Sequence, residues 1–337
     1  GLLDAAGRIR EPFATVHAHQ HWRWFRTGGE FYPRVDAFAF PVGTPLSEDA
    51  MTGIALGAAQ AGLRPIHVHI RMDFVLLCMN QLMNMAAKTH YMYAGAFRAP
   101  MVVRTIIGRS WGQGPQHSQA LHSLFAHVPG LKVVAPSNAH DAKGCLTAAI
   151  RDDNPVIFTE HRLLYYTEAY VPDESFEVKA GRSRVVAPGT DITLVGVSNM
   201  VVECLRAREI LAEVGISAEV IDPIWLQPLD ADTILASASK TGRLLVVDNA
   251  WTNCGISAEI LARVAEGADP SRPIAMKRMG FAETPCPTTP ALEKGFYASP
   301  VTVAQMAHRM VDPTDTHWAP DPALAELAHH KQFKGPF

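Results

Sequence analysis

Apolar and polar positions alternate along this chain in two kinds of short segment, one with helical spacing and one with continuous apolar runs. In the first half we predict helices over residues 51–63, 74–92 and 138–153, and strands over 64–70, 100–107, 131–136 and 154–161. Strands that alternate with helices in this order predict a mostly parallel, doubly wound α/β sheet. Because these strands are apolar throughout, we expect both faces of the sheet to be covered.

The alternation pauses in a polar stretch rich in Pro and Gly and then starts again. Further strands are predicted over residues 191–198, 216–223 and 243–249, and further helices over 200–215, 230–242 and 255–267. The pattern therefore predicts two doubly wound α/β domains. We place the boundaries as follows: a first domain over 1–170, a linker over 171–190, a second domain over 191–312 and an extended C-terminal tail over 313–337.

Composition and charge exclude several classes of protein. The chain has 337 residues, 48% hydrophobic and 19% charged, a globular balance that suits about two domains. A formal net charge of −3 argues against nucleic acid as a partner. No apolar run reaches the roughly 18 residues of a membrane span, and the first residues do not resemble a secretory signal. Five scattered cysteines without a CxxC pair disfavour disulfides and structural zinc, and favour a cytoplasm or, as the alternative, an organelle matrix.

Two histidine-rich stretches raise the possibility of a metal site. "TVHAHQHWRWF" contains His17, His19 and His21, and "PIHVHIR" contains His67 and His69. Histidines spaced HxH at a strand end can hold a metal ion. A metal-dependent hydrolase of that kind needs further ligands on an eightfold βα barrel, and the two-domain pattern has no such repeat. This reading is therefore the least favoured alternative.

Three other features have ordinary structural explanations when each is taken alone. Glu48 precedes a helix, where a carboxylate favours the helix dipole. His117 ends the Gly-rich loop "GRSWGQGPQHSQ", and a histidine there is structural about as often as catalytic. "AIRDDNPVIF" reads as a usual polar loop between a helix and a strand.

Taken together and in order, these motifs are far more specific. "TPLSE", "GQGPQHSQ", "FAHVPGLKVVAPSN", "AIRDDNPVIF" and "PALEK" resemble the beta subunit of thiamine-diphosphate-dependent 2-oxo acid dehydrogenases, a family with pyruvate, branched-chain oxo acid and acetoin dehydrogenase components. The resemblance covers about residues 43–311. It implies a pyrimidine-binding domain followed by a transketolase C-terminal-like domain. It also implies an α2β2 heterotetramer with thiamine diphosphate at the interface between the alpha and beta subunits.

The resemblance also implies roles for individual residues. Glu48 matches the glutamate that hydrogen-bonds N1′ of the aminopyrimidine ring, and burial would help it to share a proton. Phe74 matches the aromatic that packs on this ring, and a plain core aromatic is the alternative. His117 matches the loop histidine that faces the substrate. Tyr91 and Gln116 are further candidate cofactor contacts.

Metal ions and the reaction follow from the same resemblance. The "GDGx…N" motif for Mg²⁺ and diphosphate is absent from the sequence, so the alpha subunit is expected to supply most Mg²⁺ ligands. A structural K⁺ is the role implied for the backbone of Ala149, Ile150, Asp152 and Asn154. The implied reaction is decarboxylation of a 2-oxo acid and acyl transfer to the lipoyl domain of a dihydrolipoyl acyltransferase core. A thiamine-dependent lyase or ketol-transferring subunit without a lipoyl partner, and a catalytically silent subunit, are alternatives.

The chain departs from the family in two stretches near the expected site. "HAHQHWRW" stands where relatives carry an acidic pair, and "HVHIRMDF" has His69 and Arg71 where relatives have an acidic or apolar residue and an aromatic. An added arginine and several histidines suit a substrate with an extra carboxylate, phosphate or polar ring. We therefore predict that His19, His21, His69 and Arg71 face a 2-oxo acid other than pyruvate.

Overall fold

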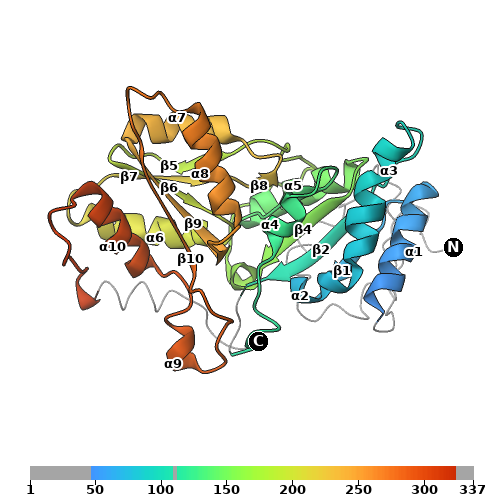
Figure 1. The fold of residues 1–337 in the computed structure, drawn as a ribbon, viewed down its shortest axis with the longest axis horizontal. Helices are drawn as coiled ribbons and strands as arrows, with labels where there is room; N and C mark the ends of the chain where they lie inside the picture. The colour runs from blue at the N-terminus through green and yellow to red at the C-terminus, as the bar shows by residue number, and fades with distance from the viewer. Residues whose placement is uncertain (1–46, 109–111, 324–337) are drawn as a thin grey trace.

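The computed structural model describes residues 47–108 and 112–323, which form two α/β halves, each built on a five-stranded sheet (Figure 1). The elements of the first half are α1 (Glu48–Gln60), β1 (Ile66–His69), α2 (Met72–Val75), α3 (Ala87–Met92), β2 (Val102–Ile107), α4 (His122–Ala126), β3 (Lys132–Val134), α5 (Ala139–Arg151) and β4 (Val156–His161). Those of the second half are β5 (Arg184–Ala187), β6 (Ile192–Gly196), α6 (Met200–Ala212), β7 (Ala218–Asp222), β8 (Trp225–Gln227), α7 (Ala231–Thr241), β9 (Arg243–Trp251), α8 (Ile256–Gly267), β10 (Ala275–Phe281), α9 (Pro290–Glu293) and α10 (Pro300–Val311).

Both sheets are parallel except for one edge strand. The first sheet has the order β1-β2-β4-β3-β8, and only β8 runs antiparallel to its neighbour. The second has the order β10-β9-β6-β7-β5, and only β5 is antiparallel. Since parallel neighbours need crossover connections, the helices that link them cover the sheets.

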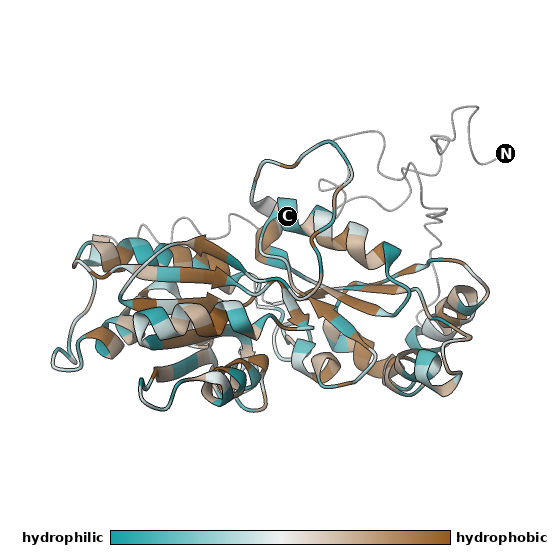
Figure 2. Ribbon diagram, turned by 90° about the horizontal axis from the view of Figure 1, so that it is seen from above, coloured by the Kyte–Doolittle hydropathy of each residue, from teal (hydrophilic) through white to brown (hydrophobic). Residues whose placement is uncertain are grey.

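Alternate strand residues point to opposite faces, and each face packs against its own helices. In the first sheet, Val103 and Ile157 join a core with α1 and the segment from α2 to α3. The residues next to them, Val102 and Val156, join a separate core with α5. The second sheet is covered in the same way, by α6 and α10 on one face and by α7 and α8 on the other. The predicted class of two doubly wound α/β domains is therefore confirmed, and Figure 2 shows the apolar strands between amphipathic helices.

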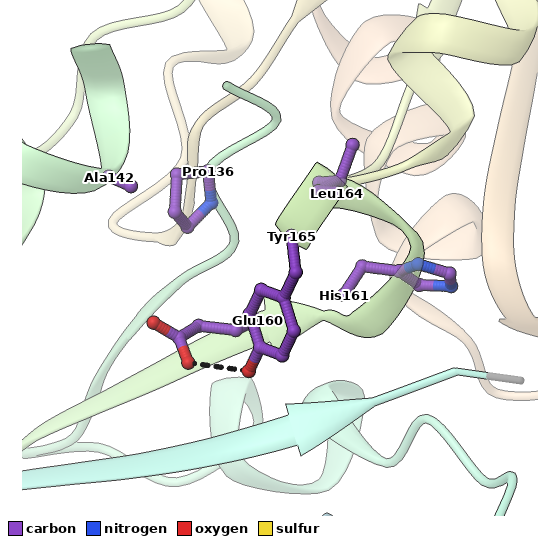
Figure 3. A pocket seen from close by; sticks show the side chains of 6 residues that line it. All are labelled: Pro136, Ala142, Glu160, His161, Leu164 and Tyr165. Atoms are coloured by element: carbon purple, nitrogen blue, oxygen red, sulfur yellow. Dashed lines mark hydrogen bonds between the residues drawn. The ribbon is translucent and has the colours of Figure 1, made fainter. Parts of the chain in front are cut away.

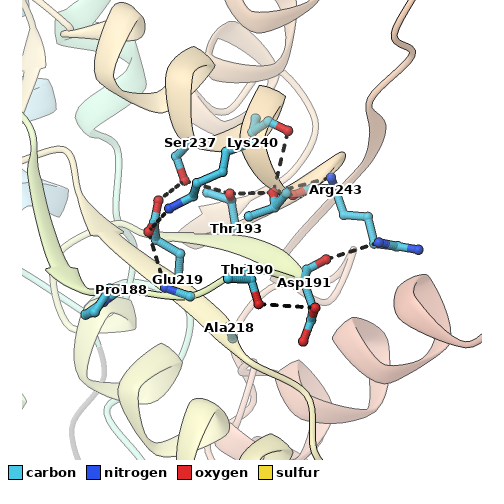
Figure 4. Close-up of polar contacts among 12 residues, drawn as sticks. Pro188, Thr190, Asp191, Thr193, Ala218, Glu219, Ser237, Lys240 and Arg243 are labelled. Atoms are coloured by element: carbon cyan, nitrogen blue, oxygen red, sulfur yellow. Dashed lines mark hydrogen bonds and ion pairs between the residues drawn. The ribbon is translucent and has the colours of Figure 1, made fainter.

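A polar chain fastens α7 to the second sheet (Figure 4). Ser237 on α7 donates a hydrogen bond to Glu219 on β7 at 2.5 Å, and Lys240 pairs with the same carboxylate. Thr193 on β6 lies 2.7 Å from Ser237 and 2.8 Å from Thr241, measured between hydroxyl oxygens. Because the hydroxyls of Thr193, Ser237 and Thr241 all have partners, their burial adds little desolvation cost.

The two halves share one hydrophobic core. Met72 and Phe125 from the first half belong to the same buried cluster as Ala250, Phe281 and Phe296 from the second. Strand β8 strengthens the connection, since it directly follows β7 in the chain and pairs with β3 of the first sheet. The carboxyl end of β1 therefore lies against a surface to which both halves contribute.

The structure adds elements that the pattern does not predict. β5 falls within the stretch predicted as a linker, and β8, β10, α4 and α10 have no counterpart among the predicted segments. The helix predicted over 74–92 is a composite from Met72 to Met92, with a 3₁₀ stretch at Leu76–Cys78 and a π-helical stretch at Asn80–Ala86. Such irregular turns often occur at functional sites.

Candidate active site

Two residues predicted as site residues meet at the carboxyl end of the first sheet. Phe74 lies on α2, directly after β1, and its ring meets that of His117 edge-on, with centroids 5.3 Å apart and planes 69° apart. Phe74 keeps 37% of its surface exposed, so it is not an ordinary core aromatic. An exposed aromatic face with a histidine at its edge is suited to receive a flat heterocycle.

Asp73 anchors the loop that carries His117. Its Oδ1 accepts hydrogen bonds from the Gln119 side chain at 2.8 Å and the Gln119 backbone N–H at 3.3 Å, while Leu121 donates its backbone N–H to the Met72 sulfur at 3.1 Å. Burial raises the pKa of Asp73, and its Oδ2 is buried without a hydrogen-bond partner among the described residues. Asp73 is not among the predicted site residues, although an acidic residue inside "MDF" was a signal that could have identified it.

Glycines let the same loop pack tightly against the second half. Gly112 and Gly114 have φ angles of +70° and +72°, in the left-handed region that favours glycine. A Cβ on Gly112 would lie 2.6 Å from the Thr288 carbonyl oxygen, and one on Gly114 would lie 2.5 Å from the Thr288 methyl group. The His117 loop is therefore held between Asp73 and a loop of the second half.

Glu48 is the first residue of α1 and is half-buried. This position favours a carboxylate because the unpaired N–H groups of the first turn carry partial positive charge. The Thr52 hydroxyl donates to the Glu48 carbonyl oxygen at 2.7 Å, one turn along the helix. The backbone of Glu48 is thereby tied to its own helix, and its side chain lies at the helix end.

His69 and Arg71 lie inside the chain in this structure. His69 is 5% exposed and Arg71 is 4% exposed. Burial, reinforced by the neighbouring His67, lowers the pKa of His69 to about 4. Burial, reinforced by Arg162, lowers the pKa of Arg71 to about 10. The structure therefore buries both side chains, and His17, His19 and His21 lie outside the described residues.

The two remaining candidate cofactor contacts lie on different elements. Gln116 is exposed and precedes His117 in the loop. Tyr91 is 89% exposed on α3, near Thr89, which accepts a hydrogen bond from Gln60 at the last residue of α1. Glu48 is at the opposite end of α1, about 18 Å from Gln60 along the helix axis. Within this chain the structure therefore does not bring Tyr91 to Glu48.

The turn predicted to hold K⁺ presents two carbonyl oxygens to the guanidinium group of Arg64. The Arg64 Nη1 donates to the Ile150 oxygen at 2.9 Å and to the Asp152 oxygen at 2.8 Å. The Asp152 carboxylate accepts the Asn154 backbone N–H at 2.9 Å and also pairs with Lys132. Converging carbonyl oxygens fit a hard cation, because each oxygen has a second lone pair beyond the one that Arg64 uses.

A small pocket lies at the carboxyl end of β4. It is lined by Pro136, Ala142, Glu160, His161, Leu164 and Tyr165 (Figure 3). The Tyr165 hydroxyl donates to Glu160 at 2.9 Å, and the other oxygen of Glu160 accepts from Arg104 at 2.9 Å. None of the residues predicted for the site lines this pocket.

Over 47–108 and 112–323, no group of three or more His, Cys, Asp or Glu side chains is arranged to hold a metal ion. No helix in this part of the chain is long and apolar enough to cross a membrane. The two five-stranded sheets also differ from the eightfold barrel that the metal-hydrolase reading requires, so that reading was wrong.

Comparisons with known proteins agree with this architecture. "Transketolase, pyrimidine binding domain" matches residues 37–168, and "Transketolase, C-terminal domain" matches residues 181–303. The beta subunit of acetoin:2,6-dichlorophenolindophenol oxidoreductase from Cupriavidus necator is 42% identical over 79% of this chain and 79% of its own length. This chain belongs to the family of beta subunits of thiamine-diphosphate-dependent 2-oxo acid dehydrogenases.

Other members of the family extend the comparison. The mitochondrial pyruvate dehydrogenase E1 component subunit beta of Dictyostelium discoideum is 39% identical over 80% of this chain and 77% of its own length. A solved structure titled a split gene transketolase, inactive beta4 tetramer, superimposes with a TM-score of 0.67 over 79% of this chain and 82% of that chain, at 20% identity. That similarity supports the fold, and the family is shown by the closer sequences.

Proposed function

We propose that this chain is the beta subunit of a heterotetrameric, thiamine-diphosphate-dependent dehydrogenase that decarboxylates a 2-oxo acid and transfers the acyl group to a lipoyl domain. The observation that carries the proposal is the half-exposed Phe74 ring with His117 at its edge, at the carboxyl end of a parallel sheet. In open α/β sheets ligands bind outside the carboxyl ends of the strands. The relatives that match most of the chain are the beta subunits of an acetoin oxidoreductase and of a pyruvate dehydrogenase E1 component.

The residues of this chain fit one side of the cofactor. When bound, thiamine diphosphate supplies the carbon nucleophile and the electron sink for decarboxylation. Phe74 offers an apolar face to the aminopyrimidine ring, and Glu48 holds a proton against its N1′ atom. His117 faces the substrate and donates a hydrogen bond to developing negative charge on oxygen. The buried Asp73 carboxylate keeps the His117 loop in position.

The remaining parts of the site belong to the partners. We propose that an alpha subunit supplies most ligands of Mg²⁺ and the diphosphate, in an α2β2 assembly, and that a dihydrolipoyl acyltransferase core accepts the acyl group. The turn at Ile150 and Asp152 is the candidate K⁺ site, beside Arg64. We place the enzyme in the cytoplasm, with an organelle matrix as the alternative, because the relatives include bacterial and mitochondrial proteins.

We also propose that the substrate is a 2-oxo acid other than pyruvate. The support is the replacement of family residues in the stretches with His19 and His21 and with His69 and Arg71. Because His69 and Arg71 are buried, they would shape the pocket from behind rather than contact the substrate. A panel of 2-oxo acids tested on the reconstituted enzyme measures this, and a clear preference for pyruvate would overturn the proposal.

Glu48→Gln tests the central proposal. Glutamine keeps the size of the side chain but cannot exchange a proton with N1′, and general acid–base steps contribute about 10²- to 10⁴-fold to rates. We expect decarboxylation by the reconstituted α2β2 enzyme to fall by about 100-fold or more while the assembly stays intact by gel filtration. Asp49→Asn, at the next and exposed position, is the control and should stay near wild type. Full activity of Glu48→Gln would overturn the mechanism.

A further inference from the structure

A short polar chain connects strand β1 to the first turn of α1, where Glu48 lies. The Thr52 side chain is fully buried, and its Oγ1 lies 2.7 Å from the Glu48 carbonyl oxygen and 3.0 Å from Nε2 of His67 on β1. Thr52 therefore contacts both the turn carrying Glu48 and the sheet. The function proposed above does not use His67 or Thr52.

Counting hydrogens fixes the direction of these bonds. A hydroxyl has one hydrogen, and that of Thr52 is donated to the Glu48 carbonyl oxygen. The contact between Thr52 and His67 must then be donated by Nε2–H of the imidazole. Burial lowers the pKa of His67, which favours the neutral imidazole, and here its single hydrogen lies on Nε2.

A second layer holds the His67 ring from behind. The ring of His69 meets it edge-on at 4.4 Å between centroids, with planes 89° apart. Nε2 of His69 lies 3.7 Å from the Cys78 sulfur, whose own hydrogen is donated to the Val75 carbonyl oxygen at 3.1 Å. His67 is thereby fixed between Thr52 and His69, and its donor points at α1.

The amino end of α1 needs this support. Ser47 occupies the N-cap position but makes no side-chain hydrogen bond to the helix. Side-chain caps usually satisfy the free N–H groups of the first turn and stabilise a helix end by roughly 1 kcal/mol. The contact from His67 through Thr52 is a tertiary anchor at the turn where a local cap is missing.

We propose that His67, acting through Thr52, is a positioning residue for Glu48 and holds the first turn of α1 at the place where Glu48 meets the cofactor. The inference rests on the proposed function. It explains the histidines of "HVHIR" as a support behind the site rather than as ligands of a metal ion or of the substrate.

Paired substitutions separate the hydrogen bonds from packing. Thr52→Val keeps the shape and removes the hydroxyl, while Thr52→Ser keeps the hydroxyl. His67→Leu removes the donor, while His67→Gln places an amide N–H near the position of Nε2. Thr147→Val is the matched control, because Thr147 on α5 also donates to the carbonyl four residues earlier, at 2.9 Å from the Lys143 oxygen.

Two measurements are made on the reconstituted α2β2 protein. Without cofactor, hydrogen exchange at the amides of residues 50–54 should rise about tenfold in Thr52→Val and His67→Leu, as expected for the loss of one net hydrogen bond. With cofactor, kcat should fall about tenfold or more at an unchanged KM for the oxo acid. Thr52→Ser and His67→Gln should recover most of both losses, and Thr147→Val should show neither.

The results also separate this inference from the proposed function. If Glu48→Gln is inactive but Thr52→Val and His67→Leu match wild type in exchange and kcat, only the positioning role fails. Equal defects in His67→Gln and His67→Leu would also overturn it, because the donor would then be irrelevant. If Glu48→Gln is fully active, the proposed function fails and this inference fails with it.

Discussion

At the scale of single residues, burial decides what the histidines of β1 can do. His67 and His69 follow the alternation that would place two ligands on one side of a strand, and they do share a side. That side is covered by α1 and by Cys78, so it faces the protein interior. The spacing was informative about the face, but the sequence did not show what covers it.

His69 should make the protein less stable in mild acid. Its pKa is about 4 in the folded chain and 6.5 when unperturbed, so between these values the unfolded state binds more protons. The free energy of unfolding should therefore fall as pH drops from 6.5 to 4, by about 3 kcal/mol from this residue.

Thermal or urea unfolding of the assembled protein across this pH range measures the effect. In His69→Phe the free energy of unfolding should fall less between pH 6.5 and 4, since the titrating imidazole is gone. His127→Gln, at an exposed position, should leave the decline unchanged. The same slope in His69→Phe as in wild type would contradict the assignment.

At the scale of elements, the loop carrying His117 depends on residues far away in the chain. Asp73 and Met72 hold one end, and Thr288 packs on Gly112 and Gly114. The Gly-rich motif indicates a tight loop, but the partner from the second half has no signal in the local pattern. The loop is thus a contact between the two halves as well as a carrier of His117.

Gly114→Ala should reduce activity much more than its effect on the backbone alone predicts. The added Cβ meets the Thr288 methyl group at 2.5 Å and must take a φ near +72°. Gly215→Ala is the matched control, with a φ of +76° and nothing within 4 Å. We expect about a 100-fold loss of kcat for Gly114→Ala and a loss of only about 1 kcal/mol in stability for Gly215→Ala.

Adding Thr288→Ser to Gly114→Ala removes the clashing methyl group and should restore part of the activity in steady-state assays. No recovery, with the double variant folded, would show that the contact with Thr288 does not control the loop.

At the scale of the whole molecule, a buried polar pair crosses between the halves. His122 on α4 lies 3.1 Å from Asp248 on β9, measured from Nε2 to Oδ1, and both side chains are completely buried. The other nitrogen of His122 and the other oxygen of Asp248 make no hydrogen bond within the described chain. Among the described residues, the hydrogen bond between His122 and Asp248 is therefore the one that offsets the burial of both side chains.

Removing one member of this pair should be costly. Asp248→Ala leaves a buried imidazole without its acceptor, and an unsatisfied buried polar group of this kind costs about 1–3 kcal/mol. The double variant His122→Phe with Asp248→Ala should lose less than the sum of the single losses, by about 1–3 kcal/mol.

Urea unfolding of the assembled enzyme, applied to wild type, both single variants and the double variant, measures this coupling between His122 and Asp248. Glu259→Ala, which breaks the exposed pair with Arg263, should change stability by no more than about 0.5 kcal/mol. Additive losses in the His122 and Asp248 cycle would show that the pair does not couple the halves.

The sequence by itself determined the fold class, the order of most helices and strands, and the family. Those features depend on local periodicity and on contiguous motifs, both of which can be read along the chain. It also gave Phe74 and His117, which the structure brings together. The edge strands β5 and β8 were missed because they are short and run antiparallel, so their pairing depends on a neighbour distant in sequence.

The tertiary structure decided what surrounds each polar side chain. Asp73 became an anchor because Gln119 lies beside it, and the carbonyl oxygens of Ile150 and Asp152 face Arg64. His67 donates toward α1 only because the helix packs across β1. Hydrogen bonds and desolvation act over a few ångströms in space, and residues at that distance can be far apart in sequence, so no local pattern contains them.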